Sequence, residues 1–227
     1  MSEVPSPEQR HLVLARLREE IRRIERRPGR REGLAGCGIE AIDRALPGGG
    51  FPRGALSELS GGPASGKTAA ALSLLARLGE EDLFAWIDGR GELYPPAAAA
   101  RGVDLGRLLL VRPPALPLQL GGGDASWRSA LWAAEAILAS GAFAAAVIDV
   151  PLPRILSGAD AVSRRLQAAA ERGGTVGLWL SPARSAVRLP AAVRLELSAE
   201  HGRIIARRAG PGSAAPAARA GGGSHAA

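Results

Sequence analysis

Lysine is almost missing from this chain: Lys67 is the only one among 227 residues, and the other strongly basic side chains are arginines. Cysteine is equally scarce, and the single Cys37 excludes both an intrachain disulfide framework and a cysteine-based zinc cluster. The sequence also has no apolar run long enough to cross a membrane and no signal peptide before its first expected helix. We therefore expect a cytoplasmic protein whose Cys37 is an ordinary buried or half-buried thiol.

The composition fits a globular domain, with 46% hydrophobic and 22% charged residues. The formal net charge is +7 and the pI is about 11.1, which favours a polyanionic partner. Arginine in place of lysine can equally reflect genomic base composition, so charge alone does not decide the partner.

The one lysine lies in a segment that matches the phosphate-loop pattern GxxxxGK[ST] in full. Glycines allow backbone N–H groups to turn inward around an anion, and the following helix adds its N-terminal dipole. Lys67 reaches the β- and γ-phosphates of a nucleotide, and the Thr68 hydroxyl can bind Mg²⁺. The pattern predicts binding of ATP and Mg²⁺ by Gly61, Gly62, Pro63, Ala64, Ser65, Gly66, Lys67 and Thr68.

The sequence on both sides of this loop has the expected form. Residues 55–60 read as a short strand, and residues 68–78 form a helical pattern with Leu72, Leu75 and Leu78 on one face. The alternative is a glycine turn that binds nothing, but the order of strand, loop and helix favours the nucleotide site.

Strand and helix patterns alternate through the rest of the chain. Strands are expected at 83–88, 108–111, 144–150 and 175–180, helices at 126–140 and 158–172, and a strand pair at 193–197 and 203–207 that turns at His201-Gly202. This order predicts an α/β fold: a mostly parallel central sheet flanked by helices, with an antiparallel edge.

The two ends of the chain differ from this core. Residues 7–27 form an amphipathic helical pattern whose apolar stripe consists of Leu14, Leu17, Ile21 and Ile24. The stripe can pack on the chain's own core, on a neighbouring subunit or on another protein. We expect three parts: the N-terminal helix and basic hinge at 1–31, the core at 32–208 and a disordered Gly/Ala/Ser/Pro tail at 209–227.

Acidic and aromatic residues at or after strand ends are further candidates for the nucleotide site. Asp149 ends an apolar strand, the place where phosphate-loop enzymes hold the Mg²⁺ shell, so we assign it to the nucleotide and metal site together with Thr68. The alternative for Asp149 is capping a turn, and Asp88 has the same two interpretations. Tyr94 is placed to stack on adenine or to anchor its loop.

The stretch Gly38–Leu46, Pro47–Gly54 and Glu58, running into the phosphate loop, resembles the start of the RecA recombinase core. The helix Ala130–Leu138 with the following Ala139–Ala142, the segment Arg164–Gln167 and the N-terminal Leu14–Arg18 most resemble the ImuA family. These are RecA-like proteins of SOS-induced translesion synthesis in bacteria. The resemblance implies a nucleoid-associated protein with an ImuB-type adaptor and an error-prone polymerase as partners, and RecA itself and single-stranded DNA as further candidates.

The departures from RecA affect the expected chemistry. Arg90 stands where RecA has its catalytic glutamate, so no carboxylate is in register to activate water. Glu92 can substitute only if the loop shifts. Ser181-Pro182 stands where RecA carries a nucleotide-sensing glutamine. We therefore expect ATP hydrolysis to be slow or absent.

Arginines after the later strands are candidates for DNA contact, because guanidinium groups suit phosphate oxygens. They are Arg154, Arg164, Arg165, Arg184 and Arg188. A solvated basic surface is the alternative. We expect a RecA-like accessory factor of SOS-induced translesion synthesis and DNA repair that binds nucleotide and partner polymerases with weak or no hydrolysis. The alternatives are a DNA-dependent ATPase of the RecA/RadA type and a nucleotide-binding module without a link to DNA.

Overall fold

The computed structural model describes residues 33–113, 126–153, 158–183 and 191–209. The predicted N-terminal stripe of Leu14, Leu17, Ile21 and Ile24 lies outside these residues, as do Arg154, Arg184 and Arg188 and most of the predicted C-terminal tail.

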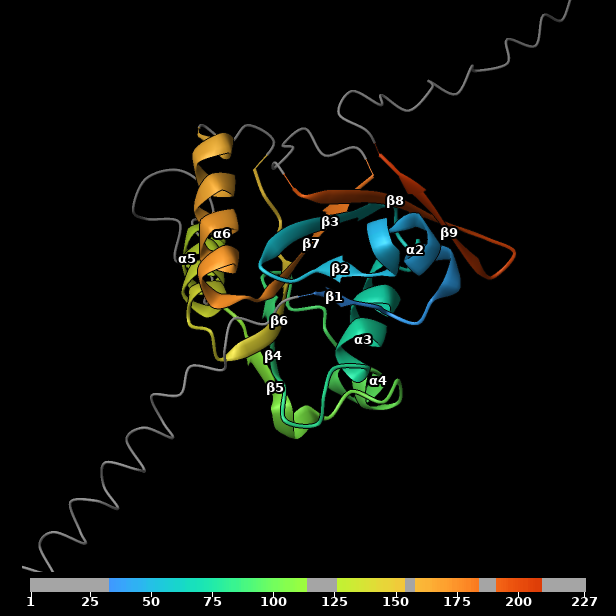
Figure 1. Cartoon of the computed structure of the whole chain (residues 1–227), viewed down its shortest axis with the longest axis horizontal. Coiled ribbons are helices and arrows are strands. Elements are labelled where there is room, and N and C mark those ends of the chain that lie inside the picture. The colour runs from blue at the N-terminus through green and yellow to red at the C-terminus, as the bar shows by residue number, and fades with distance from the viewer. Residues whose placement is uncertain (1–32, 114–125, 154–157, 184–190, 210–227) are drawn as a thin grey trace, which may run out of the picture.

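Seven strands form the main sheet, in the order β5-β4-β6-β7-β3-β8-β9 (Figure 1). They are β3 (Ala55–Gly61), β4 (Leu83–Asp88), β5 (Leu108–Val111), β6 (Phe143–Asp149), β7 (Val176–Pro182), β8 (Val193–Glu200) and β9 (Arg203–Arg208). All neighbouring pairs are parallel except β8 and β9, which are antiparallel and turn at His201-Gly202. The predicted α/β fold with its antiparallel edge is confirmed.

Helices cover both faces of this sheet. They are α2 (Glu40–Ala45), α3 (Lys67–Ala76), α4 (Pro95–Ala99), α5 (Ser126–Ala139) and α6 (Ala159–Gly173), with short 3₁₀ turns η1 (Pro47–Gly49) and η2 (Leu105–Arg107). Figure 1 shows α5 and α6 together on one side, and α2, α3 and α4 on the other. A two-stranded antiparallel ribbon, β1 (Leu34–Ala35) and β2 (Phe51–Pro52), forms a separate small sheet.

The two helical layers enclose two apolar clusters, one on each face of the sheet. Successive side chains of a strand point to opposite faces. In β4, Phe84 and Trp86 accordingly join the cluster around α3, whereas Ala85 and Ile87 join the cluster under α5 and α6. Burial on both faces explains why the central strands read as continuous apolar runs.

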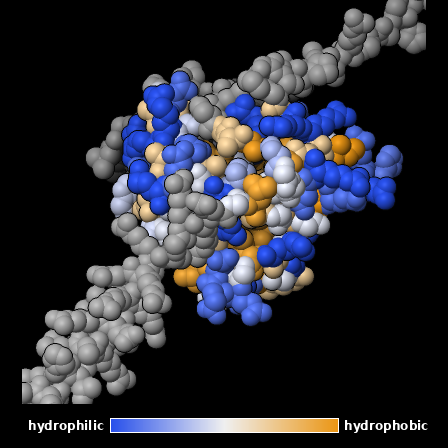
Figure 2. Space-filling model, in the orientation of Figure 1, coloured by the Kyte–Doolittle hydropathy of each residue, from blue (hydrophilic) through white to orange (hydrophobic). Residues whose placement is uncertain are grey.

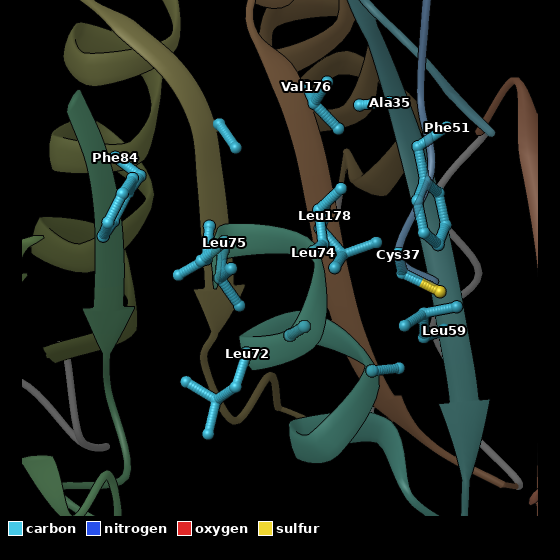
Figure 3. Packing of buried hydrophobic residues seen from close by; sticks show 14 of the residues in the cluster. Ala35, Cys37, Phe51, Leu59, Leu72, Leu74, Leu75, Phe84, Val176 and Leu178 are labelled. Carbon is cyan, nitrogen blue, oxygen red and sulfur yellow. The ribbon is translucent and has the colours of Figure 1, made fainter. Parts of the chain in front are cut away.

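Helix α3, which follows the phosphate loop, is fixed by its buried leucines. Leu72 and Leu75 are buried as the helical pattern predicts, and Leu74 is fully buried beside them. Figure 3 shows these side chains beside the strands, with Leu74 near Leu178 of β7. Packing of this kind sets the position of the loop at the helix start.

Cys37 is fully buried near Leu59 and Phe51 (Figure 3). Burial raises the pKa of its thiol to about 12, and the neighbouring Asp43 carboxylate adds to the rise. The thiol is therefore protonated at neutral pH and unreactive, which confirms the interpretation of Cys37 as an ordinary buried thiol.

The face of the molecule in Figure 2 carries both hydrophilic and hydrophobic residues. Hydrophilic residues cover α6 and the β8–β9 hairpin, and hydrophobic residues gather between them. Within the part of the chain that the structure describes, no helix combines the length and apolarity needed to cross a membrane.

We expect Leu74→Ala to lower the free energy of unfolding by about 2–5 kcal/mol, because it leaves a cavity between α3 and the sheet. Urea denaturation measures this change. Leu109→Ala is the matched control, since Leu109 is 45% exposed and its truncation should cost less than about 1 kcal/mol. Equal losses in the two variants would show that α3 is not packed as described.

Candidate nucleotide-binding site

A pocket of about 1050 Å³ lies at the carboxyl ends of the parallel strands. The phosphate loop follows β3, Asp149 ends β6, and Ser181 and Pro182 end β7, which lies between those two strands. Parallel strands bring their carboxyl ends to one edge of the sheet, where α/β proteins bind ligands. The pocket is lined by Gly61, Gly62, Pro63, Ala64, Ser65, Gly66, Lys67, Thr68, Ala69, Leu72, Arg90, Glu92, Ala97, Arg101, Asp149, Leu180, Ser181, Pro182 and Ala183.

Two glycines of the loop are required by its geometry. Gly66 has φ +91°, in the left-handed region, and a Cβ there would lie 2.6 Å from Cδ1 of Ile204 on β9. A Cβ on Gly61 would lie 2.6 Å from the carbonyl oxygen of Leu197 on β8. The antiparallel edge thus packs directly against the loop, and only glycine fits at these contacts.

Lys67 opens α3 and lines the pocket. Its Nζ donates hydrogen bonds to the carbonyl oxygens of Gly61 and Gly62, the latter at 3.3 Å. Burial lowers the pKa of Lys67, the Arg90 guanidinium lowers it further, and Asp149 opposes both effects. The neighbouring Thr68 is exposed in the same pocket. The eight residues predicted to bind the phosphates are all brought together here.

Asp149 forms an ion pair with Arg90 across the pocket. Arg90 Nε lies 3.0 Å from Asp149 Oδ1, and the side chains are 34% and 14% exposed, respectively. Burial raises the pKa of Asp149, while the charge and hydrogen bond of Arg90 act against the rise. The arginine at the position of the expected glutamate thus binds the aspartate assigned to the metal.

This pairing bears on the predicted metal site. Mg²⁺ is held in such sites by carboxylate and hydroxyl oxygens together with substrate phosphates. Here the Asp149 carboxylate is already bound by the Arg90 guanidinium, whereas Thr68 is exposed in the pocket lining. Binding of Mg²⁺ by Thr68 and Asp149 therefore stays a prediction, which the Arg90–Asp149 pair does not favour.

Asp88 organises the turn that carries Arg90. Its buried carboxylate accepts hydrogen bonds from the backbone N–H groups of Glu92 and Leu93, at 3.0 and 3.1 Å, and from Arg112 Nε at 2.9 Å. Of its two interpretations, the capping role is the one observed. Glu92 itself is exposed and lines the pocket, whose lining does not include Asp88.

Tyr94 lies away from this pocket lining. It precedes α4, is 67% exposed and is not among the lining residues. Its backbone carbonyl accepts hydrogen bonds from Ala97 and Ala98. Stacking of Tyr94 on adenine stays a prediction that this arrangement does not favour.

The structure places in this pocket one cation that the sequence did not single out, and it shows the contacts of Ser181. Arg101, which follows α4, adds a cation to the lining. Ser181 lines the pocket and donates a 2.6 Å hydrogen bond to Oε1 of the buried Glu58, whose other oxygen pairs with Arg194 of β8. No spacing pattern links these residues. Only the order β7-β3-β8 brings Ser181, Glu58 and Arg194 together.

Comparisons with known proteins decide the family. A family model described as the RecA N-terminal domain matches residues 20–151, more than half of the chain. The chain belongs to the RecA family.

The RecA-family relatives are matched over part of their length only. The RecA protein of Streptococcus pyogenes serotype M49 (strain NZ131) is 37% identical over 94 residues, and that of Streptococcus sanguinis (strain SK36) is 38% identical over 94 residues. Each match covers 41% of this chain and 25% of the relative, so this chain spans about a quarter of the length of those proteins.

A crystal structure of the RadB recombinase has a similar fold. It superposes with a TM-score of 0.58 and 18% sequence identity, covering 74% of this chain and 84% of the RadB chain. At this identity the likeness shows the fold alone.

The two described arginines among the candidates for DNA contact lie on α6 of this RecA-like core. Arg165 Nε donates to Glu135 Oε1 of α5 at 3.3 Å, while Arg164 is exposed. Both belong to the layer opposite α3, and neither lines the pocket. DNA binding by these residues stays a prediction.

The shifted pKa of Asp149 predicts a pH-dependent stability. Because its folded-state pKa lies above the ordinary 3.8, ionisation of Asp149 disfavours the folded state, and its contribution to stability falls as the pH rises through this window. We expect Asp149→Asn to raise the free energy of unfolding at pH 7 relative to the unmodified chain. The difference should disappear once the pH falls below 3.8.

Urea denaturation across this pH range measures the effect. Asp160→Asn, at an exposed position of α6, is the control and should show no gain. A loss of stability in Asp149→Asn at pH 7 would mean that the ion pair with Arg90 outweighs the cost of burial.

Proposed function

We propose that this chain is a RecA-like accessory factor of DNA repair that binds nucleotide and hydrolyses it weakly or not at all. The observation that carries the proposal is Arg90, which lies in an intact phosphate-loop pocket and pairs with Asp149. Membership of the RecA family supports the link to DNA repair.

Nucleotide binding is supported by the loop geometry. The start of α3, the ammonium of Lys67 and the left-handed Gly66 form the arrangement that cradles phosphates. Arg101 and Arg90 add positive charge to the same pocket. ATP, when bound, would supply a charged triphosphate that these residues orient and hold.

Weak hydrolysis follows from the charge beside Asp149. A water molecule that attacks the γ-phosphate is oriented or deprotonated by a positioned side chain. The residue at this position is an arginine, whose guanidinium offers hydrogen-bond donors and no acceptor atom for the proton of the water. Glu92, exposed in the pocket lining, is the residue that supports the alternative of a DNA-dependent ATPase of the RecA/RadA type.

The finer assignment is to the ImuA family of SOS-induced mutagenic translesion synthesis. It is supported by the resemblance of the α5 helix and its Ser140-Gly141-Ala142 end, and of Arg164–Gln167 on α6. The proposed partners are an ImuB-type adaptor and an error-prone polymerase, and RecA and single-stranded DNA are further candidates. The exposed Trp132 of α5, 71% accessible, belongs to the resembling helix.

Lys67→Ala is expected to abolish nucleotide binding, because it removes the ammonium that contacts the phosphates. In a thermal melt at about 100 times Kd of a non-hydrolysable ATP analogue, the unmodified chain should gain about 2.7 kcal/mol of stability. Lys67→Ala should gain none, whereas Arg203→Ala, an exposed position on β9, should keep the gain.

Turnover of ATP with and without single-stranded DNA separates the two functions. The accessory factor should show no DNA-stimulated hydrolysis. Stimulated hydrolysis that is lost in both Lys67→Ala and Glu92→Gln would establish the ATPase instead.

Partner binding is tested on the full chain with Leu14, Leu17, Ile21 and Ile24 replaced by serine. We expect this variant to lose capture of the ImuB-type adaptor and polymerase in a pull-down, because the apolar stripe is removed, while its thermal unfolding is unchanged. The control replaces Arg16 and Arg23, on the opposite face of the predicted helix, and should retain capture. A lowered melting temperature of the stripe variant would show that the stripe packs on the chain's own core.

A further inference from the structure

The turn that carries Arg90 is held in place from both sides. Asp88 and Asp149 are partners in the parallel register of β4 and β6, and the N–H of Gly89 donates to the carbonyl oxygen of Asp149 at 2.9 Å. The buried carboxylate of Asp88 binds the backbone on the other side of the turn, at Glu92 and Leu93. The backbone of this turn is therefore held at the end of β6, and from there the Arg90 side chain reaches Asp149.

The guanidinium of Arg90 can bind Asp149 and a phosphate at the same time. Its Nε is the atom that pairs with Asp149 Oδ1, so the terminal nitrogens supply further donors in the same plane. Such donors match phosphate oxygens in geometry and charge. A divalent cation bridges a carboxylate and a phosphate in the same manner.

The charges of the pocket lining already favour a polyphosphate. Its side chains comprise three cations, Lys67, Arg90 and Arg101, and two carboxylates, Glu92 and Asp149. The formal sum is therefore positive before any metal binds. A glutamate in place of Arg90 would make the sum negative, and a divalent cation would then be needed to offset it. With arginine present, a Mg²⁺ ion beside Asp149 would instead face a like charge.

We infer that the Arg90 guanidinium takes the place of a divalent cation beside Asp149, so that the pocket binds a nucleoside triphosphate without requiring Mg²⁺. This inference rests on the proposed nucleotide binding. The inference gives a reason for an arginine at the position expected for the water-activating glutamate. Arg90 cannot activate water for ATP hydrolysis, and its guanidinium supplies the positive charge that a divalent cation would otherwise bring.

The test is calorimetric titration of the full chain with a non-hydrolysable ATP analogue, once with Mg²⁺ and once with EDTA. The unmodified chain should bind with affinities that agree within about threefold, a difference of less than about 1 kcal/mol. In Arg90→Gln, affinity in EDTA should fall about tenfold or more, because a charge-assisted hydrogen bond is lost. Mg²⁺ should restore much of that affinity by occupying the place the arginine held.

Arg101→Gln is the matched control, since it removes a cation from the same pocket but leaves the Arg90–Asp149 pair intact. It should weaken binding equally in Mg²⁺ and EDTA. Thermal unfolding without nucleotide confirms that both variants are folded. A shift in metal dependence confined to Arg90→Gln supports a specific role for Arg90 over general pocket charge.

Each other outcome overturns the inference in a distinguishable way. Binding by the unmodified chain that is tenfold or more tighter in Mg²⁺ than in EDTA would show that the metal is required, while nucleotide binding itself stands. Metal-independent binding that persists in Arg90→Gln would remove the role of Arg90. No binding in either condition would defeat the proposed nucleotide binding as well.

Discussion

The parallel pairing of β4, β6, β7 and β3 is the constraint on which the site depends. Because these strands run in one direction, their carboxyl ends meet at one edge, and the segments that follow them converge. The phosphate loop, Asp149 and the turn bearing Arg90 are distant in sequence and come together only there. The antiparallel hairpin β8–β9 then packs against the loop through Ile204 and Leu197, so the edge of the sheet also shapes the phosphate cradle.

The Arg90–Asp149 pair at this edge affects both the stability of the fold and the proposed binding of nucleotide. Burial penalises the ionised aspartate, and the arginine offsets that penalty only in part, as the raised pKa of Asp149 shows. An arrangement that costs stability is expected where a residue serves a ligand. The buried Glu58, in contrast, has both carboxylate oxygens bound, one by Arg194 and one by Ser181. Arg90 and Asp149 line the pocket, whereas Glu58 and its two partners connect the neighbouring strands β7, β3 and β8.

Sequence patterns predicted most of the core because its elements are long or strongly apolar. The strands at 83–88 and 108–111 have the predicted bounds. Helix α5 ends one residue earlier than predicted, and α6 starts and ends one residue later. The missed elements are short: α2 and α4 span six and five residues, and β1 and β2 two each. So few residues carry too little periodicity to identify an element.

The phosphate loop could be identified from the amino-acid sequence alone, since its glycines, Lys67 and Thr68 are contiguous and their chemistry is local. The sequence also placed aspartate at the end of β6 and arginine two residues past the end of β4. Tertiary structure alone decided that these two side chains pair, that Arg101 joins the pocket and that Tyr94 does not line it. The physical reason is that strand order is set by long-range packing of similar apolar strands, and an apolar run does not specify its neighbours.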